Sequence, residues 1–142
     1  VGAFHWPARV VLDETLLETL SERERRQGLA ELVKTRLLAG RPLDVRGAAA
    51  YKSAVCLQDP HDHGPRRYLN LGHTFGHAYE AEAGFGGLLH GEAVSLGLCV
   101  ALELSERLSG LPASVTETAR ALEMPRSNLY TKIERHGLAR DR

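Results

Sequence analysis

Residues 91–108, GEAVSLGLCVALELSERL, form the most apolar long stretch of this 142-residue sequence. The run from Ala93 to Leu102 carries no charge and is about half as long as a bilayer-spanning helix must be. A helix that is apolar over most of its length is normally buried in the protein core. We therefore predict a central core helix over residues 91–108 and no membrane-spanning segment.

A second helix is predicted by start and stop signals. Ser21 and Glu24 have the spacing of a capping box, in which each side chain binds the other residue's backbone N–H. The helix that they begin should run to about Leu38, because Gly40 and Pro42 follow.

The remaining elements follow from local composition. We expect helices over residues 48–57 and 71–83, and a surface loop over residues 59–65, which are rich in Pro, Gly and Asp. Residues 4–12 contain the apolar run Val10-Val11-Leu12, which favours one buried strand or extended segment. The predicted fold class is mainly α, since one strand makes no sheet.

The overall composition favours a folded, cytoplasmic protein. Hydrophobic residues make up 43% and charged residues 25% of the chain, and its 18 basic and 18 acidic residues cancel. Such a balance gives no general attraction to nucleic acid or membrane. Cys56 and Cys99 form no CxxC motif, which indicates reduced, buried thiols. The sequence begins at Val1 rather than Met, which suggests a fragment.

Charge is distributed unevenly along the chain. Residues 1–112 carry 12 basic and 14 acidic side chains, whereas residues 113–142 carry 6 and 4. Gly110-Leu111-Pro112 combines a helix stop with a residue that cannot continue a helix. We therefore predict two modules, 1–112 and 113–142.

Candidate metal ligands gather in the first module. His73 and His77 lie four residues apart, so both rings should project from one helix face. His90 stands at a predicted helix start, and Glu31 adds an oxygen donor, which together favour a mixed N/O site for a catalytic divalent ion such as zinc. Two plainer alternatives remain: the histidines are surface or packing residues, and Glu31 is a solvated residue beside Lys34.

Several motifs resemble those of one enzyme family. The stretches RRYLNLGHTFGHA (66–78) and LHGEAV (89–94) resemble the hallmark of the 3-dehydroquinate synthases. Further matches occur in the same order along the chain as in the family, so that the resemblance covers most of residues 1–112. They are GAFHWP (2–7), GLAELVK (28–34), Tyr51-Lys52 and Asp59. The resemblance implies a helical metal-binding domain of the dehydroquinate-synthase type.

The resemblance also implies an activity and its cofactors. The enzymes of this family are lyases of the shikimate pathway and of aromatic amino acid biosynthesis. Their substrate is a seven-carbon phosphorylated keto acid, which undergoes oxidation, phosphate elimination, reduction and ring closure. These enzymes use NAD and a divalent metal, zinc or cobalt. Carried over to this sequence, the metal ligands are Glu31, His73 and His90.

The remaining site residues carry over in the same way. The resemblance places His77 beside the substrate rather than on the ion. It assigns substrate binding to Lys34, Lys52, Arg66, Asn70 and His77, and catalytic roles to His77, Lys34, Lys52 and Asn70. Lysine and arginine suit carboxylate and phosphate oxygens. Without the motif around it, Lys34 would read as an exposed helical lysine.

The sequence contains no Gly-rich turn between a strand and a helix of the kind that binds a dinucleotide. Gly84-Phe85-Gly86-Gly87 does not qualify because it follows a helix. We therefore expect the isolated chain to be inactive unless a separate nucleotide-binding chain supplies NAD. We also expect a homodimer.

Residues 114–138 resemble a second family, the Fis-type helix-turn-helix that ends nitrogen-regulator response regulators. Thr116 could cap the first helix, and Met124-Pro125 could form the turn. The residues predicted to face DNA are Arg126, Ser127, Asn128, Lys132 and Arg135. A plainer alternative is a helical hairpin that caps the core.

Three hypotheses follow. The chain is the metal and substrate half of a synthase, or a DNA-binding transcriptional regulator that keeps the old site as a sensor of a phosphorylated sugar acid. The third is a gene-fusion remnant with neither activity.

Overall fold

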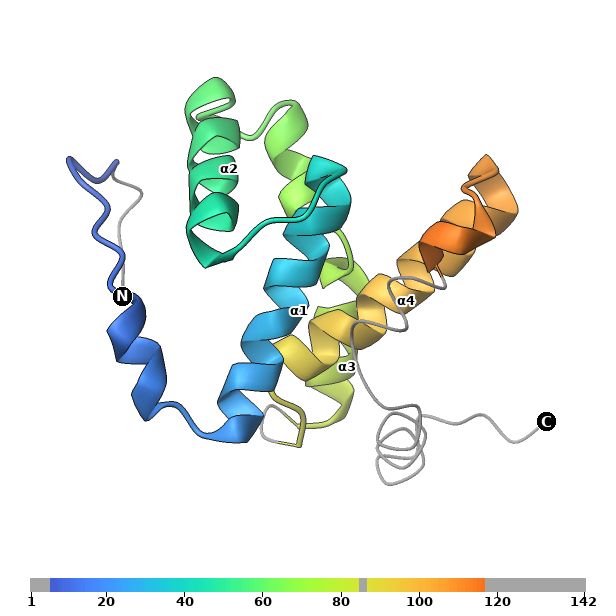
Figure 1. Ribbon diagram of the computed structural model, residues 1–142. Coiled ribbons are helices and arrows are strands. Elements are labelled where there is room, and N and C mark those ends of the chain that lie inside the picture. Colours follow the sequence, from blue (N-terminus) through green and yellow to red (C-terminus); the bar gives the residue numbers. More distant parts are fainter. Residues whose placement is uncertain (1–5, 85–86, 117–142) are drawn as a thin grey trace.

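The computed structural model describes residues 6–84 and 87–116, and the regular secondary structure of these residues is helical, without any strand (Figure 1). The mainly α prediction is confirmed, and the four predicted α-helices are present with ends shifted by at most three residues. Two short 3-10 helices were not predicted. The elements in chain order are η1 (Glu14–Thr19), α1 (Glu22–Ala39), α2 (Val45–Gln58), η2 (Pro65–Asn70), α3 (His73–Glu82) and α4 (His90–Ser109).

The predicted capping box begins α1. The Ser21 hydroxyl accepts a hydrogen bond from the Glu24 N–H at 3.3 Å, and the Glu24 carboxylate accepts one from the Ser21 N–H at 2.8 Å. Gly40 ends the helix in the left-handed region, with φ of 64°. Such a cap contributes about 1 kcal/mol to helix stability. The capping box and the glycine stop were sufficient to locate α1 from the sequence.

Helix α4 is the core helix, as predicted. Its residues 91–98 and Leu102 are buried, and α4 packs against both α3 and α1 (Figure 1). Leu98 and Leu102 form a cluster with partly buried side chains from other elements, including Leu37 and Leu71. No helix among the described residues is long and apolar enough to cross a membrane.

Glycines allow the backbones of α1, α3 and α4 to come into direct contact. A Cβ atom on Gly97 would lie 2.0 Å from the carbonyl oxygen of Gly72, and one on Gly91 would lie 2.2 Å from that of Gln27. Gly72 itself has φ of 83°, a conformation that favours glycine. These contacts hold the starts of α3 and α4, where His73 and His90 stand, against their neighbours.

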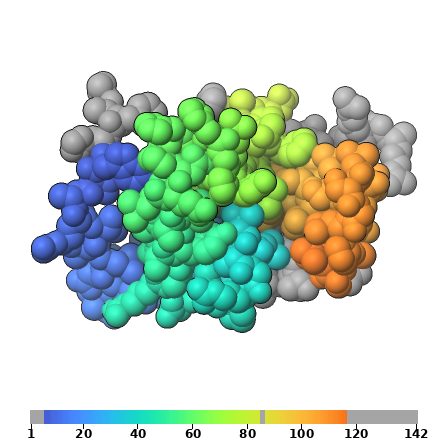
Figure 2. Space-filling view, turned by 90° about the horizontal axis from the view of Figure 1, so that it is seen from above, coloured from blue at the N-terminus to red at the C-terminus, as the bar shows by residue number. Residues whose placement is uncertain are grey.

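The segment before α1 differs from its prediction. Val10 is 66% and Val11 81% exposed, so the expected burial of this run is wrong. The physical reason is that the described residues contain no second strand to pair with it. Seen from above, the segment before α1 and the far end of α4 lie on opposite sides of the molecule (Figure 2).

The predicted module border follows the end of α4. Gly110 ends that helix with φ of 70°, and residues 113–116 are already helical, with the Val115 N–H donating to the Pro112 carbonyl at 2.9 Å. Thr116 therefore lies inside a helix, and its prediction as an N-cap is wrong. Leu111 and Val115 pack on the Leu98 cluster of α4.

Some predictions fall beyond these residues. The predicted DNA-facing residues lie outside the part of the chain that the structure describes; they are Arg126, Ser127, Asn128, Lys132 and Arg135. Cys56 and Cys99 are free of disulfide bonds and half-buried rather than fully buried.

Candidate metal centre

Three helices bring the predicted metal ligands together. Glu31 lies in α1, His73 is the first residue of α3, and His90 is the first residue of α4. One donor atom from each lies within 4.8 Å of the other two. Two imidazole nitrogens and one carboxylate oxygen form the open three-ligand set that suits a catalytic zinc ion, so the residues present fit a divalent metal.

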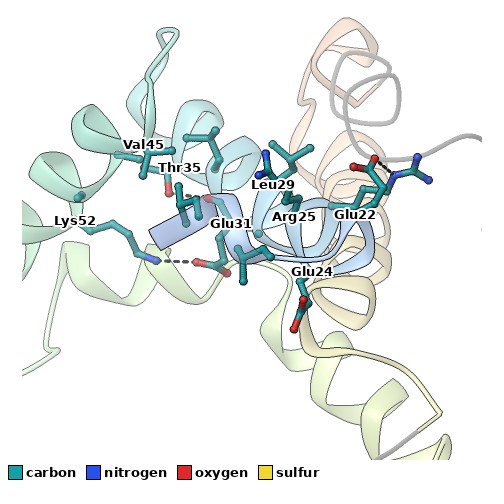
Figure 3. A pocket seen from close by; sticks show the side chains of 15 residues that line it. Glu22, Glu24, Arg25, Leu29, Glu31, Thr35, Val45 and Lys52 are labelled. Carbon is teal, nitrogen blue, oxygen red and sulfur yellow. Dashed lines mark hydrogen bonds and ion pairs between the residues drawn. The ribbon is translucent and has the colours of Figure 1, made fainter. Parts of the chain in front are cut away.

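The Glu31 carboxylate is bound from two sides by lysines. Lys34 Nζ lies 2.5 Å from Oε1. Lys52 Nζ, from α2, lies 2.7 Å from Oε2, as Figure 3 shows. Burial alone would raise the pKa of Glu31, but the two lysine hydrogen bonds outweigh it and hold the pKa below its ordinary value. The carboxylate is thus charged at neutral pH, and besides its neighbour Lys34 it contacts a lysine of a second helix, Lys52.

Lys34 is a buried residue. Its side chain is only 1% exposed, so the alternative of an exposed helical lysine is wrong. Burial lowers the pKa of Lys34, while the hydrogen bond to Glu31 works in the opposite direction. Lys52 is 39% exposed and reaches the same carboxylate from α2. Two ammonium groups facing one carboxylate leave surplus positive charge, which suits an anionic ligand.

The three histidines form one cluster. The ring centre of His73 lies 5.5 Å from that of His77 and 5.4 Å from that of His90. Burial and the charge of Lys34 lower the pKa of His73, which favours the neutral ring that a metal requires. His77 is exposed, so it stands on the open side of the cluster.

The other predicted substrate residues, Arg66 and Asn70, lie in η2, which packs against α1 and α2. Buried Asp59 accepts backbone hydrogen bonds from His63, Gly64 and Arg66 and so shapes the preceding loop. The Arg66 guanidinium donates to the Pro60 carbonyl at 3.0 Å and lies 5.7 Å from the Trp6 ring centre. Asn70 ends η2 with an exposed side chain.

A cleft of about 640 Å³ adjoins this centre (Figure 3). It lies between η1, α1 and α2, and its lining is mainly apolar, with Leu17, Leu20 and Leu29 among the contributors. Glu31 and Lys52 also line it. The cleft therefore runs from the exposed leucines of η1 and α1 to the charged side chains of Glu31 and Lys52.

Sequence reasoning missed two polar contacts. The Glu80 carboxylate lies 3.0 Å from His90 Nδ1, and Arg23 binds Glu92 with two hydrogen bonds of 3.2 and 3.1 Å that join α1 to α4. Glu80 stands three residues after His77 and seven after His73, a spacing that places all three on one helix face. For Glu80, that spacing was the signal available in the sequence.

Comparisons with known proteins identify the family to which this sequence is similar. The sequence model of the family described as "3-dehydroquinate synthase C-terminal" matches residues 9–138. Relatives named 3-dehydroquinate synthase include those of Rhodospirillum rubrum, 44% identical over 85% of this chain, and Teredinibacter turnerae, 40% identical over 86%. That of Nitrosococcus oceani is 37% identical over 99% of this chain.

The relatives are considerably longer proteins. This chain covers 37% of the Rhodospirillum rubrum protein, 40% of the Teredinibacter turnerae protein and 42% of the Nitrosococcus oceani protein. It thus spans about two fifths of the length of the curated relatives that it matches. The family match also includes residues 114–138, the stretch that resembles a helix-turn-helix.

Proposed function

Because this chain belongs to the 3-dehydroquinate synthase family through that family's C-terminal domain, we propose that it supplies the metal and substrate half of such a synthase. The proposed reaction is the conversion of a seven-carbon phosphorylated keto acid to dehydroquinate. The observation that carries the proposal is the meeting of Glu31, His73 and His90 from three helices, with two lysines on the same glutamate.

We assign the metal to Glu31, His73 and His90. A divalent ion bound there would act as a Lewis acid that lowers the pKa of substrate hydroxyls. The carboxylate and the neutral imidazole of His73 have the charge states that a cation requires.

The lysines and His77 serve the substrate in this proposal. Lys52 binds carboxylate or phosphate oxygens directly, and Arg66 and Asn70 extend this binding from η2. Lys34, which is buried against Glu31, adds positive charge behind the same site. The exposed ring of His77, 5.5 Å from His73, holds or moves a proton at an imidazole nitrogen on the open side of the cluster.

NAD would accept and return the hydride, and we propose that a nucleotide-binding partner, equivalent to the part of the relatives that this chain does not cover, positions it. This chain spans only about two fifths of its relatives, and the matched family is a C-terminal domain, so most of their remaining length lies ahead of the matched stretch. We propose that the partner docks on the exposed leucines of η1 and α1. Leu16, at 68% exposure, lies in η1 next to Leu17, which lines the cleft. Because Glu31 and Lys52 line that cleft, a partner there would meet the charged centre.

Substrate binding tests the proposal. In calorimetric titrations of the zinc-loaded chain with the phosphorylated keto acid, Lys52→Ala should weaken binding tenfold or more, as expected for a lost hydrogen bond to a charged group, worth about 1.5–3 kcal/mol. His61→Ala, in an exposed loop, is the matched control and should bind like the unaltered chain. Equal binding by both variants would contradict the assignment.

Complementation tests the partner. The chain with NAD and substrate should form no dehydroquinate, whereas adding the portion of the Teredinibacter turnerae relative that this chain does not cover should restore turnover. His77→Ala should abolish the restored turnover, and Leu16→Ser should reduce it without changing metal binding. Turnover by the chain alone would refute the need for a partner.

We propose no DNA-binding function. That alternative rests on residues 113–142, and the family match includes most of them. The relatives described above are named synthases and lend no support to a transcriptional regulator.

A further inference from the structure

Glu80 makes a contact that none of the assigned roles explains. It lies in α3, its side chain is 17% exposed, and its Oε1 is 3.0 Å from Nδ1 of His90. His90 begins α4 and is 49% exposed, which makes it the most exposed of the three proposed ligands. A ligand on an exposed ring at a helix start needs something that fixes its orientation.

His90 belongs to two groups of potential ligands. One is Glu31, His73 and His90, and the other is His77, Glu80 and His90. In the second group Glu80 would itself be a ligand. In the first, the contact between Glu80 and His90 Nδ1 leaves the other ring nitrogen, Nε2, as the donor to the ion.

The geometry at His73 favours the first group. There too Nδ1 faces an oxygen acceptor, the Leu71 carbonyl at 3.5 Å, while Nε2 lies 3.8 Å from Glu31 Oε1. Both histidines thus turn Nδ1 toward an oxygen of α3 or of the residues just before it. Metal-binding histidines commonly use their second nitrogen in this way.

We propose that Glu80 is a positioning residue, which accepts a hydrogen bond from Nδ1–H of His90 and so presents Nε2 to the metal. This inference rests on the proposed function, because it takes Glu31, His73 and His90 as the ligands. The hydrogen bond selects the tautomer with its free electron pair on Nε2, limits rotation of the ring and makes it a stronger donor. Glu80 does not touch the ion.

Zinc affinity tests the role of Glu80. Measured by competition with a coloured chelator, Glu80→Ala should weaken zinc binding 10- to 100-fold, which is the usual effect of losing such a partner. Glu80→Gln, whose amide oxygen still accepts a hydrogen bond, should recover part of the loss. Glu82→Gln, an exposed glutamate of the same helix, is the matched control and should bind like the unaltered chain.

Spectroscopy separates positioning from ligation. The visible spectrum of the cobalt-loaded chain should keep its bands in Glu80→Gln, because the three ligands are unchanged. In nitrogen NMR of the metal-free chain, His90 should carry its proton on Nδ1, and Glu80→Ala should move it toward Nε2. Far-UV circular dichroism should match for all variants.

Three results would overturn the proposal: wild-type zinc affinity in Glu80→Ala, changed cobalt bands in Glu80→Gln, or an unaltered His90 tautomer. Failure of the proposed function looks different. In that case the unaltered chain binds no zinc, or Glu31→Ala leaves its zinc affinity unchanged, whereas failure of the Glu80 role alone leaves the Glu31 dependence intact.

Discussion

Glu31 is the residue on which the centre depends, because its carboxylate meets both lysines and His73. Sequence motifs predicted the ligand types, and the i, i+4 spacing placed His73 and His77 on one face. Spacing could not predict that Glu31 reaches them, since the ligands come from three helices. Nor could it predict the burial of Lys34, which depends on packing between distant parts of the chain.

Loss of the Glu31 carboxylate should destabilise the metal-free chain, since it leaves the Lys34 ammonium buried without this partner. We expect Glu31→Ala to lower the free energy of unfolding by about 3–5 kcal/mol, as for other broken buried ion pairs. The double variant Glu31→Ala/Lys34→Met should recover most of that loss. Urea unfolding measures both.

Glu22→Ala is the control for that experiment. Glu22 pairs with Arg26 in the same helix, but both side chains are more than half exposed, so its loss should cost less than about 1 kcal/mol. If Glu31→Ala and the double variant lose the same unfolding free energy, the unpaired buried ammonium of Lys34 is not the cause of the destabilisation.

Stability should also depend on pH through Glu31. Its pKa is lower in the folded than in the unfolded chain, so its stabilisation is complete above the ordinary value of 4.5 and is lost as pH falls through the lower folded value. The difference in unfolding free energy between the unaltered chain and Glu31→Gln should therefore be constant at neutral pH and shrink in acid. Urea titrations at several pH values would show a growing difference if the sign were wrong.

Local sequence signals predicted the helices better than they predicted the contacts at the candidate metal centre. The capping box, the glycine stops and the apolar run of α4 each act within a few residues, so α1 and α4 could be located from sequence. Two features could not. The exposure of Val10 and Val11 depends on which elements pack there, and the close approach of Gly97 to Gly72 joins positions 25 residues apart.

That approach yields a prediction for Gly97. A methyl group there would overlap the Gly72 carbonyl oxygen at 2.0 Å and the Gly76 nitrogen at 2.6 Å, so Gly97→Ala should destabilise the chain by about 1–3 kcal/mol or more. It should also weaken zinc binding, because His73 follows Gly72 directly. Thermal unfolding and chelator competition measure the two effects.

Gly28→Ala provides the matched control. Gly28 also lies within a helix, and a Cβ atom there would meet nothing within 4 Å. This variant should gain up to about 1 kcal/mol from the better helix propensity of alanine. A Gly97→Ala variant as stable as Gly28→Ala would show that α3 and α4 do not pack as closely as described.

For the whole molecule, the combined observations describe a helical domain whose charged centre opens beside an apolar cleft. The family match identifies the chain as a member of the 3-dehydroquinate synthase family, and the three helices bring together the residues that we propose as metal ligands. Composition predicted a folded chain, and local sequence signals predicted its helices. Neither held information about the cleft, which forms only when η1, α1 and α2 come together.

Metal stoichiometry tests the central claim most directly. After zinc loading and dialysis at neutral pH, elemental analysis of the unaltered chain should find about one ion per chain, as expected for a three-ligand zinc site. His73→Ala should lose most of that zinc, and the control His61→Ala should keep it. Far less than one zinc per chain, or a zinc content that His73→Ala leaves unchanged, would contradict the assignment of Glu31, His73 and His90 as a metal centre.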